Sequence, residues 1–230
     1  MKNALFQTMT FSVEGSKKCA CVIAGYRGRI TGYKKVIKIL NSKGFSVIAY
    51  EHSPAVLTSG DPKMLLRLVE QICDDFLNKS TDYREVICIG ASIGAGLCFA
   101  IQKKVPNVKY GIYAGAGVSP PENIFEAPLF YLVRKEFKKS GFAETELKKA
   151  WQDIDIVPTK PTYQNSFVMA LGKKDRIVKY DKALSTLKAW QNEGQHIKII
   201  IKPKLGHFGI IRWYKNHIAE LLVEAESLEA

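Results

Sequence analysis

The chain has 230 residues, of which 47% are hydrophobic and 24% are charged, and its formal net charge is +12. This composition excludes an intrinsically disordered chain, and the length suffices for one domain with a buried core. Residues 1–15 lack the apolar run of a signal peptide, and no stretch of about 18 uncharged apolar residues predicts a transmembrane helix. We therefore expect a cytoplasmic protein.

Strands and helices are predicted to alternate along the chain. The predicted strands are short apolar runs at 19–25, 45–51, 84–90, 109–117, 166–172 and 196–206. The predicted helices show apolar residues at helical spacing and cover 33–44, 61–80, 93–107, 181–194 and 210–230. Apolar strands that alternate with helices are typical of an α/β protein, with a mostly parallel sheet covered by helices on both faces.

Two segments depart from this alternation. Residues 4–25 alternate apolar and polar side chains on either side of a turn at residues 14–16, which predicts an antiparallel hairpin at the sheet edge. Residues 118–165 separate two predicted strands, and a structureless loop of this length is uncommon in a compact domain. Their apolar residues predict helices. We expect a single domain over 1–230, with 118–165 as an inserted lid or cap.

The cysteines do not form a recognisable ligand or disulfide pattern. There are five of them, at positions 19, 21, 73, 88 and 98, and none is part of a C-x-x-C pair. Most lie in apolar surroundings. This placement predicts buried reduced thiols rather than disulfides or metal ligands.

Basic charge gathers in the first quarter of the chain. Residues 15–50 contain eight Lys or Arg residues and no Asp or Glu. Such charge can attract nucleic acid, anionic lipid or anionic metabolites. No aromatic-interleaved or helix-turn-helix pattern accompanies it. We expect a solvated surface, no nucleic-acid partner and at most weak contact with an anionic membrane surface, and a nucleic-acid or phosphoinositide binder stays as a minor hypothesis.

The stretch Gly90-Ala91-Ser92-Ile93-Gly94 fits the pattern G-x-S-x-G between a predicted strand and a predicted helix. A sharp strand-to-helix turn strains the serine and leaves no room for side chains two positions before and after it. The turn also points the Ile93 backbone N–H and the helix N-terminus at the same space. The pattern predicts an exposed nucleophile beside an oxyanion donor; the alternative is a Gly-rich turn that binds phosphate or nothing.

A serine nucleophile needs a general base, and the base needs an orienting carboxylate. Of the four histidines, His207 follows the predicted strand 196–206 and precedes a helix. Asp175 follows the predicted strand 166–172. Functional side chains collect in loops at the carboxyl ends of parallel strands. Ser92, Asp175 and His207 are therefore the candidate nucleophile, orienting acid and base.

With these residues in place, the chain resembles the α/β-hydrolase superfamily over nearly its whole length. The stretches that carry the resemblance are, in order, "IAGYRG", "LNSKGFSVIAYE", "GASIGAG", "ALGKKDRIV" and "GHFG". The resemblance implies a twisted sheet of about eight strands, a nucleophile elbow, a lid after the sixth strand, and no metal or organic cofactor. It also implies a second oxyanion donor, the backbone N–H of Tyr26.

Two departures from the family pattern are visible. Ala24-Gly25 stands where many members have His-Gly, so the oxyanion loop is expected to differ in shape. Glu51-His52-Ser53-Pro54 replaces an Asp and a Gly-rich turn, which can bring His52 toward the mouth of the site. We interpret His52 as a loop residue.

These observations predict a serine hydrolase of the carboxylesterase or lipase-like kind, which cleaves an ester or thioester of a small or lipid-like substrate through an acyl-enzyme. Phe125 and Phe130 are candidate apolar substrate contacts. Arg27 and Arg29 flank the proposed oxyanion loop and either hold an anionic substrate group or extend into water. The alternatives are a serine peptidase with the same machinery, and a non-catalytic ligand-binding or interaction protein on the same fold.

Overall fold

The computed structural model describes residues 5–105, 107–117, 119–152 and 166–228. A seven-stranded sheet forms its centre, with the strand order β1-β3-β2-β4-β5-β6-β7. β1 pairs antiparallel with β3, and all the other neighbours are parallel. The strands are β1 (Phe6–Phe11), β2 (Lys18–Ile23), β3 (Phe45–His52), β4 (Glu85–Ala91), β5 (Val108–Ala114), β6 (Ser166–Gly172) and β7 (Ile197–Lys202).

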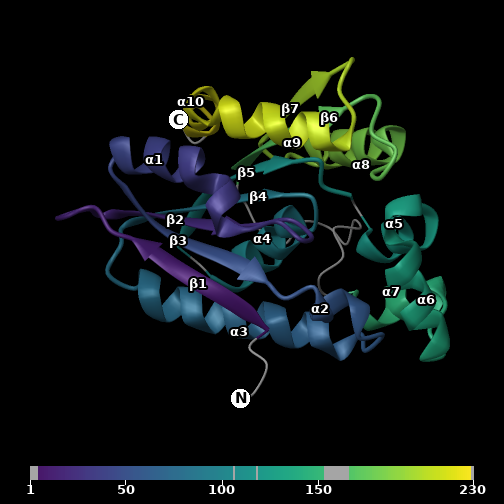
Figure 1. Ribbon diagram of the computed structural model, residues 1–230. Coiled ribbons are helices and arrows are strands. Elements are labelled where there is room, and N and C mark those ends of the chain that lie inside the picture. Colours follow the sequence, from purple (N-terminus) through teal and green to yellow (C-terminus); the bar gives the residue numbers. More distant parts are fainter. Residues whose placement is uncertain (1–4, 106, 118, 153–165, 229–230) are drawn as a thin grey trace.

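Helices cover both faces of this sheet (Figure 1). One face is covered by α3 (Lys63–Ser80), α4 (Ile93–Lys104) and α8 (Tyr180–Asn192). The other is covered by α1 (Lys34–Ser42), α9 (His207–Asn216) and α10 (Ile218–Glu226). The remaining helical elements are η1 (Ile30–Tyr33), α2 (Ala55–Thr58), α5 (Pro120–Glu126), η2 (Pro128–Phe130), α6 (Tyr131–Lys139) and α7 (Glu144–Ala150).

The inner strands are apolar on both faces because both faces are covered. In β2, Cys19 and Cys21 pack toward α3 and α4, whereas Ala20 and Val22 pack toward α1 and α10. Every residue of β6 is buried. Successive side chains of a strand point to opposite faces, so a strand between two helical layers has no polar side. The predicted α/β architecture is confirmed.

The predicted N-terminal hairpin is wrong. β1 lies at the sheet edge and is antiparallel, as expected, but its partner is β3 rather than β2. The turn between β1 and β2 crosses over the start of β3, where the Val13 N–H donates to Ser46 Oγ and the Ser16 hydroxyl donates to the Gly44 carbonyl. β3 thereby takes the position between the two strands that are neighbours in sequence.

Two further expectations need correction. The seven segments with strand patterning all form strands, but the eighth strand implied by the resemblance has no counterpart in the described residues. The segment predicted as one helix at 210–230 is two helices, α9 and α10, which meet at His217. The His217 backbone has φ −113° and ψ 21°, which departs from helical values and ends α9.

The described residues 119–152 between β5 and β6, called the inserted segment below, are helical. Figure 1 shows α5, α6 and α7 grouped at one end of the molecule, beside α2. Phe137 and Trp151 are fully buried and their rings meet edge to face, with centroids 5.5 Å apart. These side chains join the same apolar cluster as α3 and α4.

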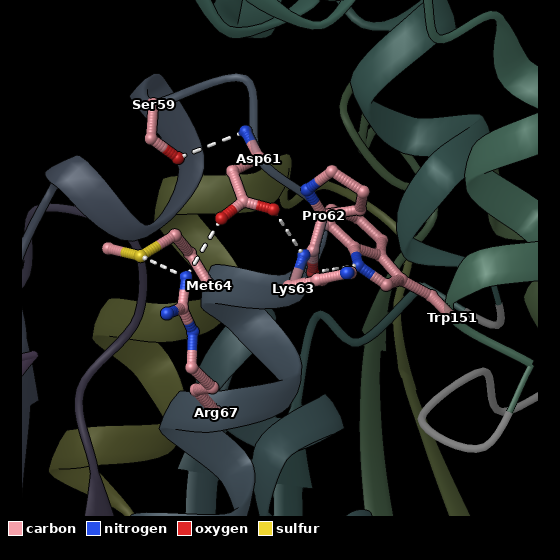
Figure 2. A network of polar contacts seen from close by, with 7 residues as sticks. All are labelled: Ser59, Asp61, Pro62, Lys63, Met64, Arg67 and Trp151. Atoms are coloured by element: carbon pink, nitrogen blue, oxygen red, sulfur yellow. Dashed lines mark hydrogen bonds and ion pairs between the residues drawn. The ribbon is translucent and has the colours of Figure 1, made fainter.

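A hydrogen-bond network connects this segment to the start of α3 (Figure 2). The indole N–H of Trp151 donates to the Pro62 carbonyl at 2.9 Å. Next to it, the Asp61 carboxylate accepts from the Lys63 backbone N–H at 2.9 Å and from the Arg67 guanidinium at 2.8 Å. An aspartate just before a helix satisfies amides that have no intrahelical partner. The same turn therefore begins α3 and holds the end of α7.

Two other expectations concern membranes and thiols. Across the described ranges, no helix combines the length and the apolar character needed to span a bilayer. All five cysteines are buried and free, as their surroundings predicted.

Candidate active site

Ser92 lies at the turn between β4 and α4, and its backbone has φ 56° and ψ −131°. Few residues with a side chain adopt such a conformation. A Cβ at Gly90 would lie 2.6 Å from the Gly94 carbonyl oxygen, and a Cβ at Gly94 would lie 2.4 Å from the Ile23 carbonyl oxygen. The two glycines are therefore required by close backbone contacts. The turn leaves Ser92 partly exposed at the carboxyl end of the sheet.

Ser92, His207 and Asp175 form a chain of hydrogen bonds. His207 Nε2 lies 3.0 Å from Ser92 Oγ, and its Nδ1 lies 2.8 Å from Asp175 Oδ2. The other oxygen of Asp175 accepts from the backbone N–H groups of Ile177 and Val178 at 2.8 and 2.9 Å. A carboxylate held in this way fixes the ring and its tautomer, so that Nε2 faces the serine as an acceptor.

The loops that carry the acid and the base are joined to each other. The Lys174 N–H donates to the Leu205 carbonyl at 2.9 Å. A Cβ at Gly172 would lie 2.5 Å from that carbonyl oxygen, so only glycine permits this approach. Side-chain exposure is 2% for Asp175 and 5% for His207, which shields their pairing from water. The sheet thus brings together three residues that are far apart in sequence.

The two proposed oxyanion donors flank Ser92. Ile93 is the first residue of α4, and Tyr26 follows β2 in a tight loop in which the Gly28 N–H donates to the Gly25 carbonyl at 2.8 Å. No hydrogen-bond partner for either N–H is found in the described part of the chain. A Cβ at Gly25 would lie 3.4 Å from the Ser92 Cβ, which shows how close the loop approaches the serine.

A cavity of about 420 Å³ opens beside Ser92 and His207. The inserted segment supplies one of its walls, and α9 supplies another. The apolar wall residues are Leu129, Phe130, Leu132 and Val133 from the former and Phe208 and Ile211 from the latter. Leu129, Leu132 and Phe208 are also strongly exposed, so they form the mouth of the cavity. A cavity of this size and character suits a small or medium-sized apolar group.

A second, much smaller cavity of about 30 Å³ also borders Ser92. It is lined by Ile93, Ile124, Ile177 and other small or apolar residues. Ser92 and Phe130 line both cavities, which therefore adjoin each other at the serine. The site offers unequal space to the two halves of a substrate that is bound across Ser92.

Of the four predicted substrate contacts, the structure places two at the cavities and two away from them. Phe130 lines both cavities, and Arg27 lines the large one with its guanidinium carbon 5.3 Å from the Tyr26 ring centroid. Arg29 is exposed and Phe125 packs against the core, and neither lines either cavity. His52 is buried at the end of β3, away from both cavities, and burial lowers the pKa of its ring.

Three contributors to the site escaped the sequence analysis. Gly115 has φ 56°, and a Cβ there would lie 3.4 Å from His207 Nδ1, so a side chain would press on the base. The only signal for it was its place near the end of the predicted strand 109–117. Phe208 and Lys215 line the large cavity from α9, where sequence pattern alone gave them no role.

Within the same described ranges, His, Cys, Asp and Glu side chains form no group of three that could hold a metal ion. The arrangement around Ser92 carries several chemically active groups of its own. It has a hydroxyl, an imidazole to accept its proton, a buried carboxylate behind the imidazole, and two backbone donors beside the hydroxyl.

The parallel sheet, the turn at Ser92 and the order of the three hydrogen-bonded residues define an α/β-hydrolase. The sequence model of the prolyl oligopeptidase family matches residues 73–224, which is well over half of the chain. The chain therefore belongs to the prolyl oligopeptidase family, and it is a serine hydrolase of the α/β fold. No curated protein sequence matches it.

Solved structures share the fold at low sequence identity. An esterase of Pyrococcus furiosus is 16% identical with a TM-score of 0.63, and the match covers 96% of this chain and 91% of that chain. Thermogutta terrifontis esterase 2 is 11% identical with a TM-score of 0.65, over 97% and 91% of the two chains. The acylaminoacyl peptidase of Pyrococcus horikoshii is 15% identical with a TM-score of 0.67, over 97% of this chain and 39% of that chain.

Proposed function

We propose that this chain is a serine esterase that hydrolyses carboxylic esters of small or lipid-like substrates through an acyl-enzyme at Ser92. The observation that carries the proposal is the hydrogen-bond chain from Ser92 Oγ through His207 to Asp175, at the floor of an apolar cavity. The esterases among the structural neighbours support the same reaction type.

In the proposed first half-reaction, Ser92 Oγ attacks the ester carbonyl carbon while His207 Nε2 accepts the hydroxyl proton. Asp175 stabilises the imidazolium that forms. The negative charge on the carbonyl oxygen is stabilised by the backbone N–H groups of Tyr26 and Ile93. The bond to the leaving alkoxide then breaks, and His207 returns its proton to that oxygen, which leaves an acyl-enzyme and an alcohol.

In the second half-reaction, His207 accepts a proton from a water molecule that attacks the acyl carbonyl. Collapse of the second tetrahedral intermediate breaks the bond to Ser92 Oγ, which takes the proton back from His207. The products are a carboxylic acid and the restored serine. The sequence supplies every group that this cycle requires, so it needs no resident cofactor.

Labelling and mutation test this proposal together. A fluorophosphonate probe should modify Ser92 in the intact protein, as mapped by peptide mass spectrometry. Ser92→Ala should lower kcat for 4-nitrophenyl esters by about 10³-fold or more. Ser59→Ala is the matched control, because Ser59 is exposed and lines neither cavity. Activity of Ser92→Ala within tenfold of the wild type would end the serine-esterase proposal.

A serine peptidase is the second candidate, because a peptidase family model matches the chain and an acylaminoacyl peptidase shares its fold. Acyl-amino-acid 4-nitroanilides and the corresponding 4-nitrophenyl esters separate the two activities. A kcat/KM for the anilide as high as that for the ester would favour the peptidase. Failure of the fluorophosphonate to label Ser92, together with no hydrolysis of either compound, would favour a non-catalytic binding protein.

A further inference from the structure

The large cavity beside Ser92 is apolar over most of its wall but contains a half-buried ammonium group. Lys215 reaches the cavity from the last turn of α9. Its Nζ donates to the Gly32 carbonyl at 3.2 Å and lies 3.8 Å from the centroid of the Tyr33 ring. Tyr33 is itself buried and lines the same cavity. These two contacts fix the position of the charge.

This ammonium group has no counter-ion in the described structure. Lys215 takes part in none of the ion pairs found among the described residues. The described residues that line the cavity include no Asp or Glu. Burial lowers the pKa of Lys215, as expected for a charge taken from water without a negative partner. A half-buried cation of this kind is matched best by an anion that arrives with a ligand.

Other cations lie at the cavity or next to Lys215. Arg27 also lines the cavity, from the loop that carries the Tyr26 amide. Behind Lys215, the exposed Lys35 of α1 donates to the side-chain oxygen of Asn216 at 3.0 Å. Positive potential at a cavity with apolar walls raises the local concentration of anionic ligands.

We propose that the substrate of this enzyme is an ester with a carboxylate at the far end of an apolar chain, and that Lys215 pairs with that carboxylate in the large cavity. This inference rests on the proposed esterase function and names its substrate class. Lys215 is then a specificity-determining residue. A carboxylate is favoured over a phosphate because Lys215 is the charge that contacts hold in the cavity wall, whereas Arg27 is exposed and its charge is screened by water. A dianion would therefore keep excess charge in an apolar cavity.

Matched esters test the pairing. The 4-nitrophenyl monoesters of succinate, adipate and suberate are compared with those of butanoate, hexanoate and octanoate, which have the same chain lengths. The wild type should favour the best carboxylate ester over its neutral match by about tenfold in kcat/KM, the size expected for one charge-assisted hydrogen bond. Lys215→Met keeps the apolar stem and should remove this preference.

Lys35→Met is the matched control, because Lys35 is a neighbouring lysine that does not line the cavity. It should keep the preference for the carboxylate ester. Equal kcat/KM for the two members of every pair in the wild type would overturn the inference while leaving the esterase proposal intact. Survival of the preference in Lys215→Met would overturn it as well.

A binding measurement judges the inference independently of hydrolysis. Hexanoate, hexanol and hexyl phosphate are titrated calorimetrically into Ser92→Ala, with and without Lys215→Met. Hexanoate should bind more tightly than hexanol by about tenfold, and only when Lys215 is present. Equal binding of hexanoate and hexanol would refute the carboxylate site even if no ester is ever cleaved. Tighter binding of hexyl phosphate than of hexanoate would overturn the carboxylate assignment and show that the site prefers a phosphate.

Discussion

Ser92 is held at φ 56°, a backbone conformation that costs a residue with a side chain free energy but costs glycine little. Ser92→Ala and Ser92→Gly both remove the hydroxyl, yet only the glycine variant relieves the strain. We predict that Ser92→Gly has a free energy of unfolding about 1 kcal/mol higher than that of Ser92→Ala. Urea unfolding of the two variants measures the difference.

Gly32→Ala against wild type serves as a reference for an ordinary glycine position, since Gly32 is exposed and has no positive φ. At that position the alanine variant should be at least as stable as the wild type. Equal stability of the two Ser92 variants would show that the turn relaxes when the hydroxyl is lost.

His52 makes the stability of the fold depend on pH. Its ring is buried, Nε2 has no hydrogen-bond partner among the described residues, and burial lowers its pKa below the ordinary value of 6.5. The unfolded chain therefore binds a proton more readily than the folded one. The stabilising contribution is fully present above pH 6.5 and is lost as the pH falls toward the folded-state pKa.

We predict that the wild type loses more thermal stability between pH 7.5 and pH 5.5 than His52→Leu does, because leucine does not titrate. The measurement is the melting temperature of both proteins at the two pH values, with His196→Leu as the control for an exposed histidine. A larger fall in melting temperature for His52→Leu than for the wild type would contradict the role of His52 in the pH dependence.

At the scale of elements, a hydrogen bond from Trp151 to the Pro62 carbonyl joins the inserted segment to the start of α3 (Figure 2). Trp151→Phe removes the donor, whereas the Pro62 carbonyl still accepts the first intrahelical hydrogen bond of α3. We predict that it costs about 0.5–1.5 kcal/mol more than Trp190→Phe. Trp190 is a suitable control because it is similarly buried, while its indole N–H has no partner in the described residues.

Chemical denaturation of the two tryptophan variants gives the comparison directly. Esterase activity adds a second readout, because the inserted segment carries part of the cavity wall. Trp151→Phe should raise KM for octanoyl esters more than Trp190→Phe does. Equal losses of stability would mean that the lost indole volume, rather than the hydrogen bond, determines the cost.

The same segment should set the preference for acyl chain length. Leu132 and Phe130 line the large cavity, and each methylene that enters it contributes up to about 0.8 kcal/mol. We predict a higher kcat/KM for octanoyl than for acetyl 4-nitrophenyl ester. Leu132→Ser should reduce the octanoyl value more than the acetyl value. Equal kcat/KM for the two esters in the wild type would show that the inserted segment does not touch the substrate.

At the scale of the whole molecule, every cysteine lies in the apolar cluster on the α3 and α4 side of the sheet. All five are free and buried, and burial raises the pKa of Cys19 and Cys73 to about 12. Because all five thiols are buried, a disulfide reagent cannot reach them in the native protein, so it should not react with them. We predict no fast modification by dithionitrobenzoate in buffer and five equivalents in guanidinium chloride, measured by absorbance. Rapid modification of the native protein would reveal openings of the core.

The accuracy of the sequence predictions differed between local and long-range features. The strand that precedes Ser92 and the turn around it follow from the order of apolar residues and glycines, which is a property of neighbours in sequence. The pairing of β1 with β3 depends on which buried strand lies between two others, and residues 4–25 alone carry no sign of it. Lys215 gained a role only because folding places it beside a cavity whose other walls come from distant segments.

The strand order β1-β3-β2 also has a consequence for the time course of synthesis. β1 precedes β2, α1 and β3 in the chain, so its partner β3 is made only after β2 and α1. Until then its amide groups have no sheet to join, and the nascent chain exposes them to other chains and to chaperones. β1 is expected to dock after β2 and β3 have paired, so this strand reaches its final position later than its place in the chain order suggests.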